Sequence, residues 1–114
     1  MIKLAVSPGD PAGIGPDICI KAFSPRDNLG FTPVIFGDME LFQERAENLG
    51  YPIKIKEYKG QKQLDCDSFW ISSYPLNKKI EPGRPDPSYA GYLLTILKEA
   101  VVRTINKEFS GLVT

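Results

Sequence analysis

The 114-residue sequence contains no histidine, which excludes several kinds of active site within these residues. A histidine metal ligand, a histidine general base and a Ser-His-Asp triad all require an imidazole. Cysteine is scarce as well, with only Cys19 and Cys66. The two do not form a CxxC pair, so we expect two buried or partly buried thiols rather than a disulfide.

The chain also lacks net charge, because 14 Lys and Arg residues balance 14 Asp and Glu residues. We therefore expect no broad basic surface for nucleic acid or acidic membranes. No apolar run is long enough to span a bilayer, and the first residues show no signal-peptide pattern. We expect a single domain in the cytoplasm, with neither a nucleic-acid nor a membrane partner.

Glycine and proline are concentrated in one stretch near the start of the chain. Residues 7–17 hold three of the ten glycines and three of the ten prolines, directly after the apolar run 2–6. The run predicts a short buried strand, and Pro16 suits the first turn of a helix. Free N–H groups and a positive dipole end would then meet in one place, which favours an anionic ligand. A tight strand-to-helix connection without a ligand fits the same pattern.

Strands and helices alternate along the rest of the sequence. Strands are predicted at residues 32–36, 53–58, 69–74 and 112–114, and helices at residues 16–23, 39–49 and 89–109. Residues 24–28 end the first helix, and residues 75–87, with four prolines, predict an ordered surface loop. Alternating apolar and charged residues place the strand at 53–58 near a sheet edge. This order indicates an α/β, three-layer domain with a largely parallel sheet.

Several polar residues near these elements have structural roles in this interpretation. Asp17 lies in the first helical turn, where the helix dipole favours a carboxylate. Asp38 follows the second strand, as a ribose-binding acid does, but Ile18 stands where the third glycine of that motif belongs. Asp38 is therefore interpreted as a helix cap, and Asp86 or Ser88 as the cap of the last helix. Arg84 could meet an anionic ligand, although an ordinary exposed arginine is the simpler interpretation.

The last helix carries more apolar residues than one sheet face needs. We expect its inward stripe to contain Leu93, Leu97, Ala100, Val101, Ile105 and Phe109, and Gly111 to cap its end. Leu94, Ile96 and Val102 widen that stripe, while Arg103 lies mostly away from it. The second apolar surface indicates packing against a further domain or a second subunit, although a three-layer core could also absorb it.

The glycine-rich stretch reads Gly-Asp-Pro-Ala-Gly-Ile-Gly-Pro-Asp at residues 9–17. It resembles the signature of the 4-hydroxythreonine-4-phosphate dehydrogenase family, NAD-dependent enzymes of pyridoxal phosphate (vitamin B6) biosynthesis. The isocitrate and isopropylmalate dehydrogenases are similar but lack the inserted Pro11 and Ala12. Asp17 stands where the family usually has Glu, which keeps the charge.

The resemblance implies that residues 1–114 are the N-terminal, incomplete part of a two-domain, isocitrate/isopropylmalate dehydrogenase-like subunit that works as a homodimer. It implies oxidation and decarboxylation of 4-phosphooxy-L-threonine with NAD or NADP. Asp10, Gly13, Ile14 and Gly15 would line the cofactor side of the cleft. The family holds a divalent metal (Zn, Mg or Co) with histidines, so those ligands would lie beyond Thr114. No catalytic residue is assigned within this stretch, which alone is expected to be inactive.

Other functions remain open on the sequence. A sister dehydrogenase could act on a phosphorylated four-carbon acid such as 4-phosphothreonate or 4-phosphoerythronate. A non-catalytic phosphate- or nucleotide-binding module is a second alternative, although no GxxxxGK[ST] phosphate loop is present. A purely structural piece that serves only in assembly is the third.

Overall fold

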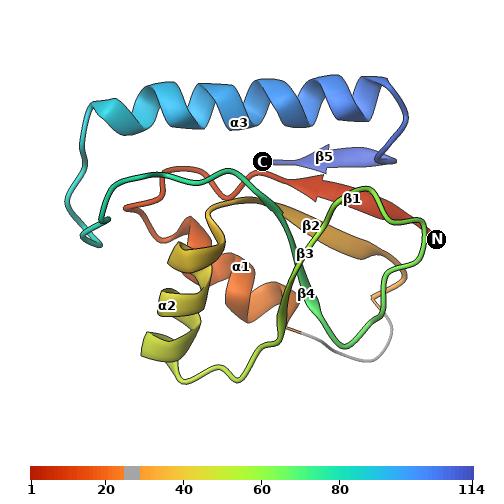
Figure 1. Cartoon of the computed structure of the whole chain (residues 1–114), viewed down its shortest axis with the longest axis horizontal. Coiled ribbons are helices and arrows are strands. Elements are labelled where there is room, and N and C mark those ends of the chain that lie inside the picture. Colours follow the sequence, from red (N-terminus) through yellow and green to blue (C-terminus); the bar gives the residue numbers. More distant parts are fainter. Residues whose placement is uncertain (25–28) are drawn as a thin grey trace.

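A five-stranded parallel sheet lies between two layers of helices in the computed structural model, which describes residues 1–24 and 29–114 (Figure 1). The elements follow in the order β1 (Lys3–Val6), α1 (Gly15–Phe23), β2 (Thr32–Gly37), α2 (Met39–Leu49), β3 (Ile55–Glu57), β4 (Phe69–Ser73), α3 (Ser88–Ile105) and β5 (Gly111–Val113). This confirms the predicted α/β class and element order. Apart from Ser24, the predicted helix end at residues 24–28 lies outside the described residues.

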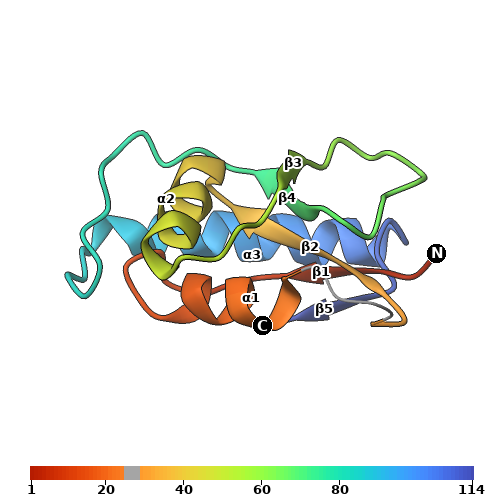
Figure 2. The same cartoon turned by 90° about the horizontal axis from the view of Figure 1, so that it is seen from below.

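The helices cover both faces of the sheet, because neighbouring residues of each strand point to opposite sides. Val6 and Ile35 pack with α1 and α2, whereas Ala5 and Val34 belong to the cluster formed with α3. Figure 2 views the molecule from the side of α1 and α2 and shows α3 running behind the strands. Strands buried on both faces read as continuous apolar runs, which is why the central ones were easy to predict.

The strand order is β3-β4-β2-β1-β5, and every adjacent pair is parallel. The chain builds the sheet to one side of β1 as far as β3 and then crosses over through α3 to place β5 on the other side. The backbone N–H of Ser7 donates to Val113 O at 2.8 Å, so the end of β1 lies against β5. The glycine-rich loop thus leaves β1 at the point where the direction of strand addition reverses. Ligands of open parallel sheets bind at such points.

The edge strand β3 and the cap of α2 agree with the sequence. β3 occupies one end of the sheet order, as its alternating pattern predicts. Gly50 ends α2 with a φ of 72°, in the left-handed region that favours glycine. The described part of the chain contains no helix long and apolar enough to cross a membrane.

The predicted end of α3 is wrong. The helix stops at Ile105, Lys107 adopts a φ of 65°, and Phe109 lies beyond the helix while still buried against Phe36 and Tyr58. Gly111 does not cap the helix, because it already pairs with Leu4 as the first residue of β5. The chain has to reverse within these few residues to bring β5 beside β1.

The predicted inward face of α3 is also partly wrong. Ile96 and Ala100 face the core, whereas Val101 is 38% exposed and Ile105 is 72% exposed. Arg103 occupies an inward position, with its guanidinium carbon 5.0 Å from the centre of the Phe36 ring. The pattern failed because a long polar side chain lies on the sheet where an apolar one was expected.

Both cysteines are free thiols, as predicted. Cys19 is buried between α1 and the sheet. Cys66 is exposed, so the expectation that it is at least partly buried is wrong. It lies in the polar segment between β3 and β4.

Candidate functional site: the glycine-rich loop after β1

The loop between β1 and α1 folds on itself through Asp10. The Asp10 carboxylate accepts a hydrogen bond from the N–H of Ala12 at 2.8 Å, and the Asp10 carbonyl accepts one from Gly13 at 2.9 Å. Gly9 has a φ of 82°, which a residue with a side chain rarely adopts. Asp10 therefore shapes the loop, whatever else it contacts.

Gly15 is required by a close approach of two backbone segments. A Cβ atom at this position would lie 1.6 Å from the carbonyl oxygen of Pro8, so no other residue fits without moving the loop. At Gly13 the corresponding distance to Asp10 O is 3.3 Å, which is tight but not prohibitive. The carbonyl of Pro8 occupies the place that a side chain at position 15 would take. Packing within the loop is therefore a structural reason for this glycine.

The start of α1 is open to solvent. Ile14, at the N-cap position, makes no side-chain capping hydrogen bond and is 73% exposed. The first N–H groups of a helix have no acceptor within the helix, and here no capping side chain supplies one. These donors and the positive end of the helix dipole are available to an anion.

Arg45, on α2, holds this loop from behind and was not singled out by the sequence reasoning. Its side chain is buried; Nη2 donates to Pro11 O at 2.9 Å and Nη1 to the Asp17 carboxylate at 2.8 Å. Both terminal nitrogens also lie 3.4 Å from Gly13 O. Asp17 therefore has a structural role, as predicted, but as the partner of Arg45 and not only through the helix dipole.

A signal for Arg45 was present in the sequence. The residue lies three positions after Phe42 and four before Leu49, on the apolar face of an amphipathic helix. An arginine on such a face has to find acceptors inside the protein. The acceptors lie about thirty positions earlier, in the glycine-rich loop and at Asp17 of α1, and no local pattern identifies them.

Asp38 links the start of α2 to the proline-rich loop. One carboxylate oxygen accepts from the N–H groups of Glu40 and Leu41 and so caps α2, as predicted. The other accepts from the N–H of Leu76 at 2.8 Å, at the start of the proline-rich loop 75–87. The cap is therefore also an anchor for that loop.

The proline-rich loop closes this end of the sheet. The N–H of Gly83 donates to Ala12 O at 2.8 Å, which links it directly to the glycine-rich loop. Arg84 is exposed and pairs with Glu81, in line with the simpler interpretation. The predicted cap of α3 is wrong, because the N-cap residue is Pro87, which makes no side-chain capping hydrogen bond. Asp86, one residue earlier, accepts from the N–H of Ser88 at 2.9 Å.

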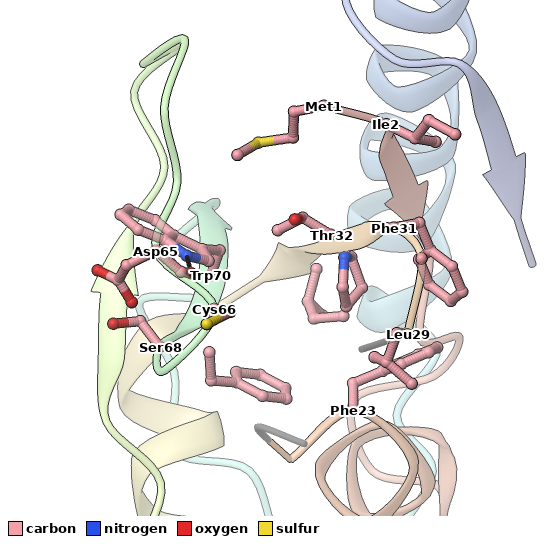
Figure 3. A pocket seen from close by; sticks show the side chains of 14 residues that line it. Met1, Ile2, Phe23, Leu29, Phe31, Thr32, Asp65, Cys66, Ser68 and Trp70 are labelled. Atoms are coloured by element: carbon pink, nitrogen blue, oxygen red, sulfur yellow. Dashed lines mark hydrogen bonds between the residues drawn. The ribbon is translucent and has the colours of Figure 1, made fainter. Parts of the chain in front are cut away.

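The candidate site does not line either of two cavities in the structure. One of about 600 Å³ lies beside Asp38, Glu44 and the proline-rich loop, and none of the four candidate residues lines it. The other, of about 270 Å³, lies at the opposite end of the strands, where Phe23, Leu29 and Phe31 face Trp70 and Asp65 (Figure 3). Asp10, Gly13, Ile14 and Gly15 come together in one surface loop, as their spacing in the sequence requires.

Curated proteins with similar sequences share one name. The chain is 33% identical over 115 residues to the 4-hydroxythreonine-4-phosphate dehydrogenase of Pseudoalteromonas atlantica, an alignment that covers 99% of this chain and 35% of the relative. It is 37% identical over 111 residues to that of Aromatoleum aromaticum, covering 97% and 32%. The chain is homologous to the 4-hydroxythreonine-4-phosphate dehydrogenases. It spans about a third of the length of these curated relatives, and no family model matches it.

Solved structures show the same fold. The crystal structure of the 4-hydroxythreonine-4-phosphate dehydrogenase from Klebsiella pneumoniae superposes with a TM-score of 0.84 at 21% identity, covering 98% of this chain and 36% of that one. The enzyme from Burkholderia phymatum gives 0.83 at 15% identity, covering 96% and 34%. These structures confirm the expected fold class. The curated sequences confirm the family resemblance that residues 9–17 carry.

Proposed function

We propose that this chain is the cofactor-binding part of an oxidoreductase that oxidises and decarboxylates 4-phosphooxy-L-threonine with NAD or NADP. Homology to dehydrogenases named for that substrate supports the reaction. The observation that carries the proposal is the position of the glycine-rich loop, at the carboxyl end of β1 and beside β5. Nucleotide cofactors bind at this position in open parallel sheets.

In this proposal the chain binds and orients the cofactor. NAD or NADP, when bound, accepts a hydride from the secondary alcohol of the substrate. The uncapped N-terminus of α1 offers N–H groups and a positive dipole to the cofactor's phosphates. Gly13 adds no side chain beside these groups, and Asp10 shapes the turn. Arg45 holds the carbonyls of Pro11 and Gly13 in place.

A metal site is not formed by the described residues. They contain no group of three or more His, Cys, Asp or Glu side chains that could hold an ion, and the sequence has no histidine. No step of the reaction is therefore assigned to a metal on this chain.

We also propose that residues 1–114 work within a larger dehydrogenase subunit that forms a homodimer. The lengths of the curated relatives support the first part. The outer face of α3 supports additional packing, since Leu94 is 66% exposed and Ile105 is 72% exposed. A further domain and a second subunit are both suitable partners for this face.

Cofactor binding is tested by placing a negative charge at the start of α1. Ile14→Glu changes an exposed residue at the helix N-terminus and should weaken NAD binding at least about tenfold, because it repels the phosphates. Ile18→Glu, one turn further along and 53% exposed, is the matched control and should change binding by less than about threefold. Titration calorimetry with NAD measures both. Equal losses in the two variants, or none, would contradict the proposed position of the cofactor.

The reaction is tested by following the absorbance of reduced nicotinamide with 4-phosphooxy-L-threonine and added divalent metal. The assay is run on the protein that contains this chain in its natural length. Turnover with 4-phosphothreonate or 4-phosphoerythronate instead would support the sister dehydrogenase. Cofactor binding without turnover on any of these substrates would support the non-catalytic module.

A further inference from the structure

A basic cavity of about 620 Å³ lies at the end of the sheet opposite the glycine-rich loop. It is formed where the start of β1, the segment after β3 and the end of α3 converge, close to the N label in Figure 1. Of its ten lining residues five are basic and one is acidic; the charged ones are Lys3, Lys59, Lys62, Arg103, Lys107 and Glu108. In a chain without net charge, this is a marked local excess of positive charge.

The single acidic group is already occupied by the protein. Glu108 accepts hydrogen bonds from Arg103 at 2.9 and 2.6 Å, one on each carboxylate oxygen, and from the Tyr58 hydroxyl at 2.8 Å. Arg103 holds the pKa of Glu108 below its ordinary value, so the carboxylate stays ionised at neutral pH. Arg103 and Glu108 thus neutralise each other in the floor of the cavity.

Few acidic groups or hydrogen-bond acceptors offset the positive charge of the lysines around this cavity. The ammonium groups of Lys62 and Lys107 make no hydrogen bond or ion pair with the described residues. Lys59 is 3.8 Å from Glu57, with 73% of its side chain exposed. Lys3 donates to Tyr58 at 2.9 Å and to Gln61 O at 3.5 Å, which leaves one of its three N–H groups. Four ammonium groups around one concavity repel each other, and an anion between them relieves that repulsion.

We propose that this cavity binds a small phosphate-bearing anion that carries two or more negative charges. Its volume is within the range of small-molecule sites, and lysines bind phosphate as point charges. The balanced charge of the whole chain favours a small molecule over an extended polyanion. The site is separate from the glycine-rich loop, and the proposal does not depend on dehydrogenase activity.

The test is a titration of the protein that contains this chain in its natural length with sodium pyrophosphate at constant ionic strength, followed by calorimetry and by amide chemical shifts. Pyrophosphate should shift the amides of residues 59–62 and 107–110. The double variant Lys62→Gln with Lys107→Gln should weaken binding at least about tenfold. The matched control, Lys54→Gln with Lys98→Gln, removes the same charge from exposed positions outside the cavity and should change binding by less than about threefold.

Three outcomes would overturn the proposal. Wild-type protein that does not bind millimolar pyrophosphate excludes the site. Equal losses of affinity in the two double variants would mean that binding depends only on the overall charge of the chain and not on this cavity. Shifts confined to residues 10–15 would place the anion at the start of α1 instead, a result that would leave the proposed cofactor site standing. Ile14→Glu should leave binding in the basic cavity unchanged.

Discussion

The glycine-rich loop and the aromatic cluster under α3 each contact an arginine that is paired with a carboxylate, and the two pairs work differently. Arg45 is almost fully covered, with 6% of its side chain exposed, and donates mostly to backbone carbonyls of one loop. Arg103 is 22% exposed, lies against aromatic rings and donates to side chains, including Ser72 at 2.8 Å. The first arginine fixes a backbone; the second fixes a group of side chains.

The two arginines differ because they stabilise different kinds of structure. A loop of glycine, alanine and proline has few side chains that could pack against the core, so its position depends on hydrogen bonds to its carbonyls. The aromatic cluster of Phe36, Tyr58 and Phe109 would remain packed by its own apolar surface. Substitutions that release the glycine-rich loop should therefore cost more than equivalent ones in the aromatic cluster.

The largest effect is expected from Gly15→Ala. The new Cβ would lie 1.6 Å from Pro8 O, so we expect the free energy of unfolding to fall by about 4 kcal/mol, or folding to fail. Gly91→Ala is the matched control, because no atom lies within 4 Å of a Cβ at that helical position. It should raise stability by up to about 1 kcal/mol. Urea unfolding measures both, and similar values for the two would argue against the close contact at Pro8.

The comparison between the arginines is tested by replacing each with methionine. Arg45→Met leaves the Pro11 and Gly13 carbonyls without donors and Asp17 without its partner, and should lower stability by about 3 kcal/mol. Arg103→Met should cost about 1 kcal/mol, since its pair is more exposed to water and the methionine still covers the rings. Chemical unfolding of both variants decides the order. A larger loss of stability for Arg103→Met would contradict the greater importance that we assign to Arg45.

Acid should weaken the contacts of Arg103 with the aromatic cluster through Glu108. Its pKa is lowered from an ordinary value of 4.5, chiefly by the hydrogen bonds from Arg103. Because the folded pKa is depressed, the stabilisation is complete above pH 4.5 and is lost as pH falls through the folded value. The stability of Glu108→Gln should therefore decrease less than that of the wild type over this acidic range. Parallel pH profiles of the two proteins would show that the pair contributes nothing.

The smallest effect concerns the two thiols and leaves stability unchanged. Cys66 is exposed at the edge of the cavity in Figure 3, whereas burial raises the pKa of Cys19 to about 11. A disulfide reagent at neutral pH should therefore modify one thiol per chain rapidly and the second only on unfolding. Cys66→Ser should abolish the rapid reaction, and Cys19→Ser should preserve it. Rapid modification of both thiols would mean that α1 separates readily from the sheet.

Local patterns were sufficient for most of the fold. Asp38 and Gly50 mark the ends of α2 by capping chemistry, and the alternation around Lys54 and Lys56 identifies an edge strand. Such features depend on residues within one turn or one strand of each other. The family resemblance likewise rests on nine consecutive residues.

What the sequence could not show depends on contacts between distant segments. Arg103 was placed outside the core because its acceptors, Ser72 and Tyr74, belong to another element. The same holds for Arg45 and its loop. The assignment of Asp10, Gly13, Ile14 and Gly15 to a cofactor stays a prediction. Their closeness in the sequence already places them in one loop, but it does not identify the ligand that the loop binds.

The position of β1 between β2 and β5 has a consequence for the order in which the protein forms. β1 can pair with β2 as soon as residues 32–35 have been made, but its other edge waits for residues 111–113. Until those residues have been made, that edge presents unpaired backbone groups, and the pairing that covers it joins Leu4 with Gly111. On the ribosome, β1 is therefore the first of these five strands to emerge and among the last of them to be fully paired.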